Sequence, residues 1–247
     1  YPEWRYKGKR SPNIYYKEVI NKVSLLRVPL FIPKRASGIW RSKIALVADD
    51  MYRSCSFTNT GMEKSHTEYS NNLYDLLNTL VPILPFYGLQ YSLSSGCTYP
   101  DLTRDLIQTI NNGVALINYI GHGNSESWSD EKFINKSRDL PLIHPRENKL
   151  AIWVAGTCSF GNYYQENSFM EDLLLKEDGA IAVIASTEAI SAPKNHEFIE
   201  SIFSEISDYI TVASKKMRLG ELVWNSKNGD KKFHTFGDPA LLLPFPK

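Results

Sequence analysis

A short apolar run, Val114-Ala115-Leu116-Ile117-Asn118-Tyr119-Ile120, ends at Gly121-His122-Gly123. A second run, Leu150-Ala151-Ile152-Trp153-Val154-Ala155, ends at Gly156-Thr157-Cys158. Apolar runs of this length are typical of strands that are buried on both faces of a parallel sheet. We therefore expect two neighbouring strands that each end in a reactive side chain, an imidazole in one and a thiol in the other.

Helix and strand patterns alternate around these two runs. Ile44 to Ala48 reads as a buried strand that stops at Asp49-Asp50, Ala180 to Ala185 reads as another, and Leu89 to Leu93 is a weaker strand candidate. The alternation with helices predicts an α/β fold whose sheet is mostly parallel, because parallel strands need crossover connections that cover both faces.

Three helices are predicted between these strands. Tyr69 to Leu80 carries Leu73, Leu76, Leu77 and Leu80 on one side, and Asp101 to Asn112 turns Leu102, Leu106 and Ile110 inward. A capping box, Ser168-Phe169-Met170-Glu171, opens a third helix that runs to Lys176. Another helix, around Ile14 to Leu26, belongs to a basic and aromatic lead-in segment, residues 1–39, which precedes the main domain at 40–247.

Composition excludes several classes of function. The chain has 247 residues, with 28 Lys and Arg against 27 Asp and Glu. A net charge of +1 gives no broad positive field for nucleic acid or an anionic membrane. No apolar run approaches the roughly 20 residues that a membrane-spanning helix needs. The chain begins at Tyr1, without an initiator Met, so we expect a processed chain or an excerpt.

The three cysteines, Cys55, Cys97 and Cys158, are too few for a disulfide framework, and their odd number leaves at least one free thiol. A lone buried cysteine is usually structural, and Gly-His-Gly by itself is usually a turn. Cys158 and His122 differ because both follow buried strands, where the functional crevice of an open α/β sheet lies. The structural and catalytic interpretations of this pair are about evenly matched on residues alone, whereas Cys55 and Cys97 are expected to be structural.

If the pair is catalytic, the Cys158 thiolate is the nucleophile and His122 exchanges protons with it and with the leaving amine. Gly123 lacks a Cβ, so its main-chain N–H can approach a substrate carbonyl and form an oxyanion hole with the N–H of Cys158. Asp49 either terminates its strand or orients the imidazole as a third catalytic group.

The remaining histidines, His66, His144, His196 and His234, lack the spacing of metal ligands, so no metal site is predicted.

Four segments, in order, resemble the gingipain family of cysteine peptidases in the caspase-like clan. They are Gly113 to Gly123 with Ser127-Trp128, Ala155 to Cys158, Ala182 to Thr187, and Phe236-Gly237-Asp238-Pro239-Ala240-Leu241. The resemblance implies a three-layer α/β/α sandwich, a dyad of Cys158 and His122, Gly123 as an oxyanion donor and Asp49 as the acidic third member. Glu63, three residues before His66, matches the acid that forms the pocket for a basic P1 side chain in trypsin-like members.

Two stretches, Trp40 to Ile44 and Val47 to Asp50, are most similar to the sortase-like signal peptidases of the type IX secretion system. This implies an endopeptidase at a bacterial surface, with exported proteins as substrates and secretion-system components as partners. No cofactor is required, and the resemblance allows a structural calcium ion. A secreted trypsin-like protease and an inactive caspase-like binding module are the alternatives.

Overall fold

The computed structural model describes residues 38–50, 64–164, 168–212 and 216–245. The predicted helix around Ile14 to Leu26 lies outside the described residues.

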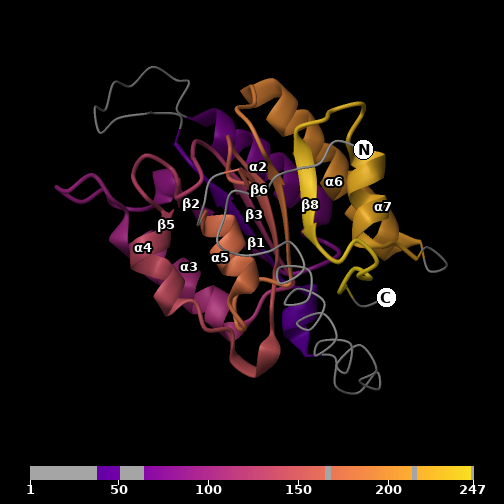
Figure 1. The fold of residues 1–247 in the computed structure, drawn as a ribbon, viewed down its shortest axis with the longest axis horizontal. Helices are drawn as coiled ribbons and strands as arrows, with labels where there is room; N and C mark the ends of the chain where they lie inside the picture. Colours follow the sequence, from indigo (N-terminus) through magenta and orange to yellow (C-terminus); the bar gives the residue numbers. More distant parts are fainter. Residues whose placement is uncertain (1–37, 51–63, 165–167, 213–215, 246–247) are drawn as a thin grey trace.

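The described residues form one central sheet (Figure 1). In sheet order its strands are β2 (Ile83–Tyr87), β1 (Ile44–Ala48), β3 (Leu116–Ile120), β6 (Ile152–Gly156), β7 (Ala182–Ser186) and β8 (Phe233–Gly237). All neighbours pair in parallel except β8, which runs antiparallel to β7. The predicted parallel arrangement of the strands at 44–48, 114–120, 150–155 and 180–185 is therefore confirmed.

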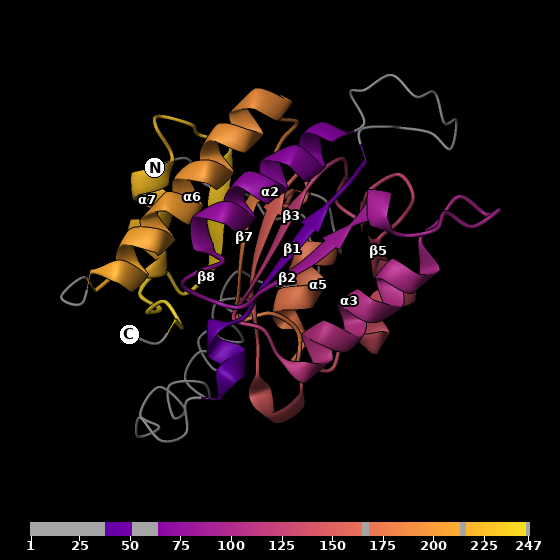
Figure 2. The same ribbon diagram turned by 180° about the vertical axis from the view of Figure 1, so that it is seen from behind.

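Helices cover both faces of the sheet (Figures 1 and 2). One face carries α2 (Ser65–Leu77), α6 (Ala192–Thr211) and α7 (Leu219–Ser226). The other carries α3 (Pro100–Asn112) and α5 (Phe169–Leu175), together with the short α4 (Lys136–Asp139) and a hairpin of β4 (Ser127–Trp128) and β5 (Ile134–Asn135). A hydrophobic core lies on each face of the sheet, between the strands and the helices. Alternate residues of a strand point into opposite cores, so Leu46 packs toward α2 and Val47 toward α3. The predicted three-layer α/β/α sandwich is confirmed.

Two of the predicted boundaries are wrong. A strand was expected at Leu89 to Leu93, but the second strand along the chain is β2, and the 3-10 turn at Gly88–Gln90 overlaps the start of the expected stretch. β2 contains Pro85, which would interrupt a central strand, but β2 is the edge strand of the described sheet and has one free side. Pro85 therefore does not break the pairing with β1.

The helix predicted at Tyr69 to Leu80 begins earlier and ends earlier, as α2. Its buried residues are His66, Ser70, Leu73 and Leu77, which recur at helical spacing, while Leu76 and Leu80 are 39% and 37% exposed. Two of the four inward positions are thus polar, which is why a search for apolar periodicity misplaced the helix. The helices at α3 and α5 match their predictions, including the Ser168 side chain that accepts a hydrogen bond from the N–H of Glu171.

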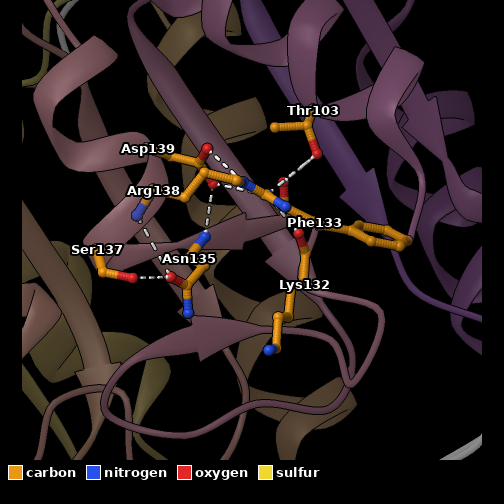
Figure 3. Close-up of polar contacts among 7 residues, drawn as sticks. All are labelled: Thr103, Lys132, Phe133, Asn135, Ser137, Arg138 and Asp139. Carbon is orange, nitrogen blue, oxygen red and sulfur yellow. Dashed lines mark hydrogen bonds and ion pairs between the residues drawn. The ribbon is translucent and has the colours of Figure 1, made fainter. Parts of the chain in front are cut away.

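A polar network fixes the β4–β5 hairpin, which follows His122 in the chain, against α3 (Figure 3). The guanidinium of Arg138 donates to both carboxylate oxygens of Asp139 at 2.7 Å and to the carbonyl of Lys132. Asp139 is 1% exposed and also accepts from the N–H of Asn135 at 2.7 Å. Thr103 of α3 donates to the carbonyl of Phe133, which completes the link.

We expect Asp139→Ala to lower the free energy of unfolding by about 2–3 kcal/mol, because it leaves the N–H of Asn135 and the Arg138 guanidinium without their buried acceptor. Chemical denaturation of the two proteins measures this difference. Asp101→Ala is the matched control, since Asp101 pairs with Arg104 at an exposed position and should cost much less. Equal losses for the two variants would contradict the assigned role of the network.

Candidate active site

The register of the two central strands places His122 and Cys158 together. Ile120 at the end of β3 lies opposite Gly156 at the end of β6, and His122 and Cys158 each follow their strand by two residues. The N–H of Gly121 donates to the carbonyl of Gly156 at 3.2 Å, which extends the pairing one residue toward the site. The predicted candidates for base and nucleophile therefore emerge side by side from the carboxyl edge of the sheet.

Cys158 is half-buried and free. Its thiol lies 3.5 Å from both the carbonyl and the N–H of Ile190, in the loop after β7. Ile190 was not singled out from sequence, since a main-chain contact leaves no signature in residue type. Cys97, by contrast, is disulfide-bonded, which leaves Cys158 as the thiol available for chemistry among the described residues.

Gly123 has a packing reason to lack a side chain. A Cβ there would lie 2.7 Å from the hydroxyl of Thr157 and 2.8 Å from the carbonyl of Ser127. Thr157 immediately precedes Cys158, so the absent side chain lets the loop that carries His122 (the histidine loop) pack directly on the loop that carries Cys158. The role of Gly123 as an oxyanion donor remains a prediction, which this close approach of the two loops favours.

Asp49 lies directly under the histidine loop. Its Oδ2 accepts a hydrogen bond from the main-chain N–H of His122 at 2.9 Å and one from the Tyr119 hydroxyl at 3.2 Å. The same hydroxyl lies 2.5 Å from the carbonyl of His122, so its single proton is shared between the two acceptors. These bonds hold the main chain on both sides of the imidazole. The expected third member therefore positions the histidine loop, and a direct effect on the imidazole remains a prediction.

Three buried carboxylates, those of Asp49, Asp50 and Glu131, each offer an oxygen within 4.8 Å of the other two. Burial first, and the neighbouring Asp50 charge second, raise the pKa of Asp49 well above its usual value. Burial also raises the pKa of Glu131. Among the described residues this is the one group whose oxygens could share a hard cation. The structural calcium ion allowed by the resemblance remains a prediction.

Three histidines that are far apart in the sequence, His66, His122 and His196, are neighbours in the structure. His66 of α2 and His196 of α6 lie in contact, and the ring of His66 adjoins that of His122. The one group of three potential metal ligands among the described residues contains no histidine. His144 pairs with Asp178 at the surface, and His234 lies in β8.

Glu63 and Cys55 lie outside the described residues, so the proposed P1 pocket remains a prediction. Among the helices that the structure describes, none is both long and apolar enough to cross a membrane.

Known proteins share both the sequence pattern and the fold. The chain is 28% identical over 196 residues to gingipain R2 of Porphyromonas gingivalis strain ATCC 33277, which covers 67% of this chain and 24% of that protein. A gingipain R1 of the same species matches with the same identity over 18% of its length. The chain thus spans about a quarter or less of these relatives.

The crystal structure of the Arg-specific cysteine proteinase gingipain R superposes with a TM-score of 0.68 at 18% identity, covering 92% of this chain and 52% of that one. Its complex of pro- and mature domains superposes with a TM-score of 0.62. These likenesses establish the fold. The family model of peptidase family C25 matches residues 15–244. The chain therefore belongs to peptidase family C25.

Proposed function

We propose that this chain is a cysteine endopeptidase in which Cys158 is the nucleophile and His122 is the general acid and base. The in-register pairing of β3 and β6 carries the proposal, because it brings the imidazole and the free thiol to equivalent positions beyond two central strands. A thiol and an imidazole on neighbouring strand ends are the minimum that cysteine-histidine catalysis requires. Membership in a peptidase family supports the same chemistry.

In this mechanism the Cys158 sulfur attacks the scissile carbonyl carbon, and the thiol proton passes to His122. Negative charge develops on the carbonyl oxygen, where the N–H groups of Gly123 and Cys158 would stabilise it. His122 then protonates the departing amine, and the C–N bond breaks to leave a thioester on Cys158. Water, deprotonated by His122, attacks the thioester, releasing the carboxylic acid and restoring the thiol. No metal or organic cofactor takes part in these steps.

The substrates we propose are exported proteins, cleaved by a type IX sortase-like enzyme at the bacterial surface. Similarity of Trp40 to Ile44 and of Val47 to Asp50 to that group supports the assignment. The disulfide at Cys97 is consistent with an oxidising compartment outside the cytosol. A secreted trypsin-like protease and an inactive binding module are the alternatives. Profiling at P1 tests the first, and labelling by a thiol-directed probe tests the second.

Cys158→Ala should reduce turnover of a peptide-library substrate by about four orders of magnitude or more, because no other group replaces the nucleophile. Its melting temperature should stay close to that of the wild type, since the thiol is only half-buried and adds little packing. His122→Ala should be nearly inactive, and Asp49→Asn, which keeps an acceptor for the N–H of His122, should be affected less. Kinetics and thermal melts on the same preparations measure both effects.

Labelling by a thiol-directed peptidyl probe supplies the control. A peptidase should react at Cys158 in the wild type far faster than in His122→Ala, whereas a binding module should show no difference. Wild-type cleavage rates in Cys158→Ala would refute the mechanism.

Glu63→Gln should weaken any preference for Arg or Lys at P1 by about 10- to 100-fold in kcat/KM, since it removes the charge that would pair with the substrate. Profiling with peptides that differ only at P1 measures the preference. Glu68→Gln, an exposed position in the first turn of α2, is the matched control. An unchanged P1 preference in Glu63→Gln would show that this glutamate does not set specificity.

A further inference from the structure

Two buried histidines, one on α2 and one on α6, lie next to the His122 imidazole on the face of the sheet that these helices cover. His66 is the second residue of α2 and His196 lies in the second turn of α6, and they are 3% and 5% exposed. Their helices run side by side over the same face of the sheet (Figure 2). The Nδ1 of His66 lies 3.3 Å from the Nε2 of His196. One ring therefore donates a hydrogen bond to the other.

Both rings are neutral at neutral pH. Burial lowers the pKa of His66 to about 3, with the neighbouring His196 and His122 adding to the effect, and burial lowers the pKa of His196 to about 4. A second positive charge is thereby kept away from His122 when it becomes an imidazolium during the reaction.

The ring of His66 meets that of His122 edge to face. Their centroids are 5.7 Å apart and their planes are perpendicular, at 90°. The Nε2 of His66 is buried and has no hydrogen-bond partner among the described residues. A buried polar atom without a partner is costly, so packing stability alone would favour an apolar ring at this position. The imidazole that His66 touches must hold one orientation to exchange a proton with sulfur.

The turn of α6 that carries His196 also contacts β6, the strand that precedes Cys158. Asn195, next to His196, donates from Nδ2 to the carbonyl of Gly156 at 2.6 Å, at the end of β6. Tyr69 of α2 stacks on His196 with ring centroids 3.5 Å apart, which fixes the ring that His66 bonds. The beginning of α6 therefore contacts the strand end that carries Cys158 and, through His66, the ring of His122.

We propose that His66 and His196 are positioning residues, in which His196 fixes the ring of His66 and that ring holds the His122 imidazole in its reactive orientation. This inference rests on the proposed peptidase function. The competing interpretation is a histidine pair that only packs α2 against α6. The two differ in whether losing the ring of His66 slows the chemical step beyond what the loss of stability explains.

The experiment measures kcat, KM and melting temperature for the full chain and its variants, at a temperature where every variant is folded. His66→Ala should lower kcat by about 10- to 100-fold with KM nearly unchanged, because a small misplacement of a catalytic group costs this much. His66→Phe keeps an aromatic ring against His122 but lacks the hydrogen bond to His196, so it should recover only part of the loss. Leu73→Ala, a buried change on the same face of α2, is the control for stability.

A double-mutant cycle tests the order of action. His196→Ala should cost less than His66→Ala, and the double variant should be no slower than His66→Ala, because His196 acts through His66. If His66→Ala does not fold, His66→Gln takes its place, since it keeps polar reach but lacks the ring, and the same loss of kcat is expected.

Three results would overturn the proposal: a wild-type kcat in a folded His66→Ala or His66→Gln, an equal loss of kcat in Leu73→Ala at equal destabilisation, or fully additive losses in the cycle. Failure of the peptidase function itself appears separately, as wild-type turnover that survives Cys158→Ala.

Discussion

The parallel pairing of β3 with β6 is the constraint on which the site depends. Each residue of β3 has a fixed partner in β6, so the ends of the two strands cannot shift relative to one another without breaking the central ladder. Both strands are buried on both faces, and a slip of one residue would turn every side chain toward the wrong core. The separation of the two main-chain segments that carry His122 and Cys158 is therefore set by two fully buried strands at the centre of the sheet.

Polar contacts then hold the loops that leave these strands. Asp49 and Tyr119 bond the main chain at His122, and the Thr157 hydroxyl occupies the space that a side chain on Gly123 would need. Buried carboxylates and unpartnered polar atoms cost folding free energy, yet this protein gathers them around the histidine loop. The core formed by the sheet and its helices stabilises the fold enough to offset this cost.

Several features of the fold and site were predictable because they depend on local pattern. Apolar runs, interrupted only by Asn118 in β3, marked β1, β3, β6 and β7, and the capping box marked the start of α5. The position of α2 was misjudged because His66 and Ser70 occupy inward positions that apolar periodicity does not detect. β2 was missed because Pro85 reads as an interruption, and only its place at the sheet edge makes the proline harmless.

The sequence alone determined that reactive side chains follow buried strands, because strand burial is encoded in consecutive residues. Which buried groups surround those side chains was decided by tertiary structure. His66 and His196 are separated by 130 positions, and Glu131 joins Asp49 and Asp50 from beyond β4. No local pattern relates such residues, since their proximity arises when helices and loops from distant parts of the chain pack on the same edge of one sheet.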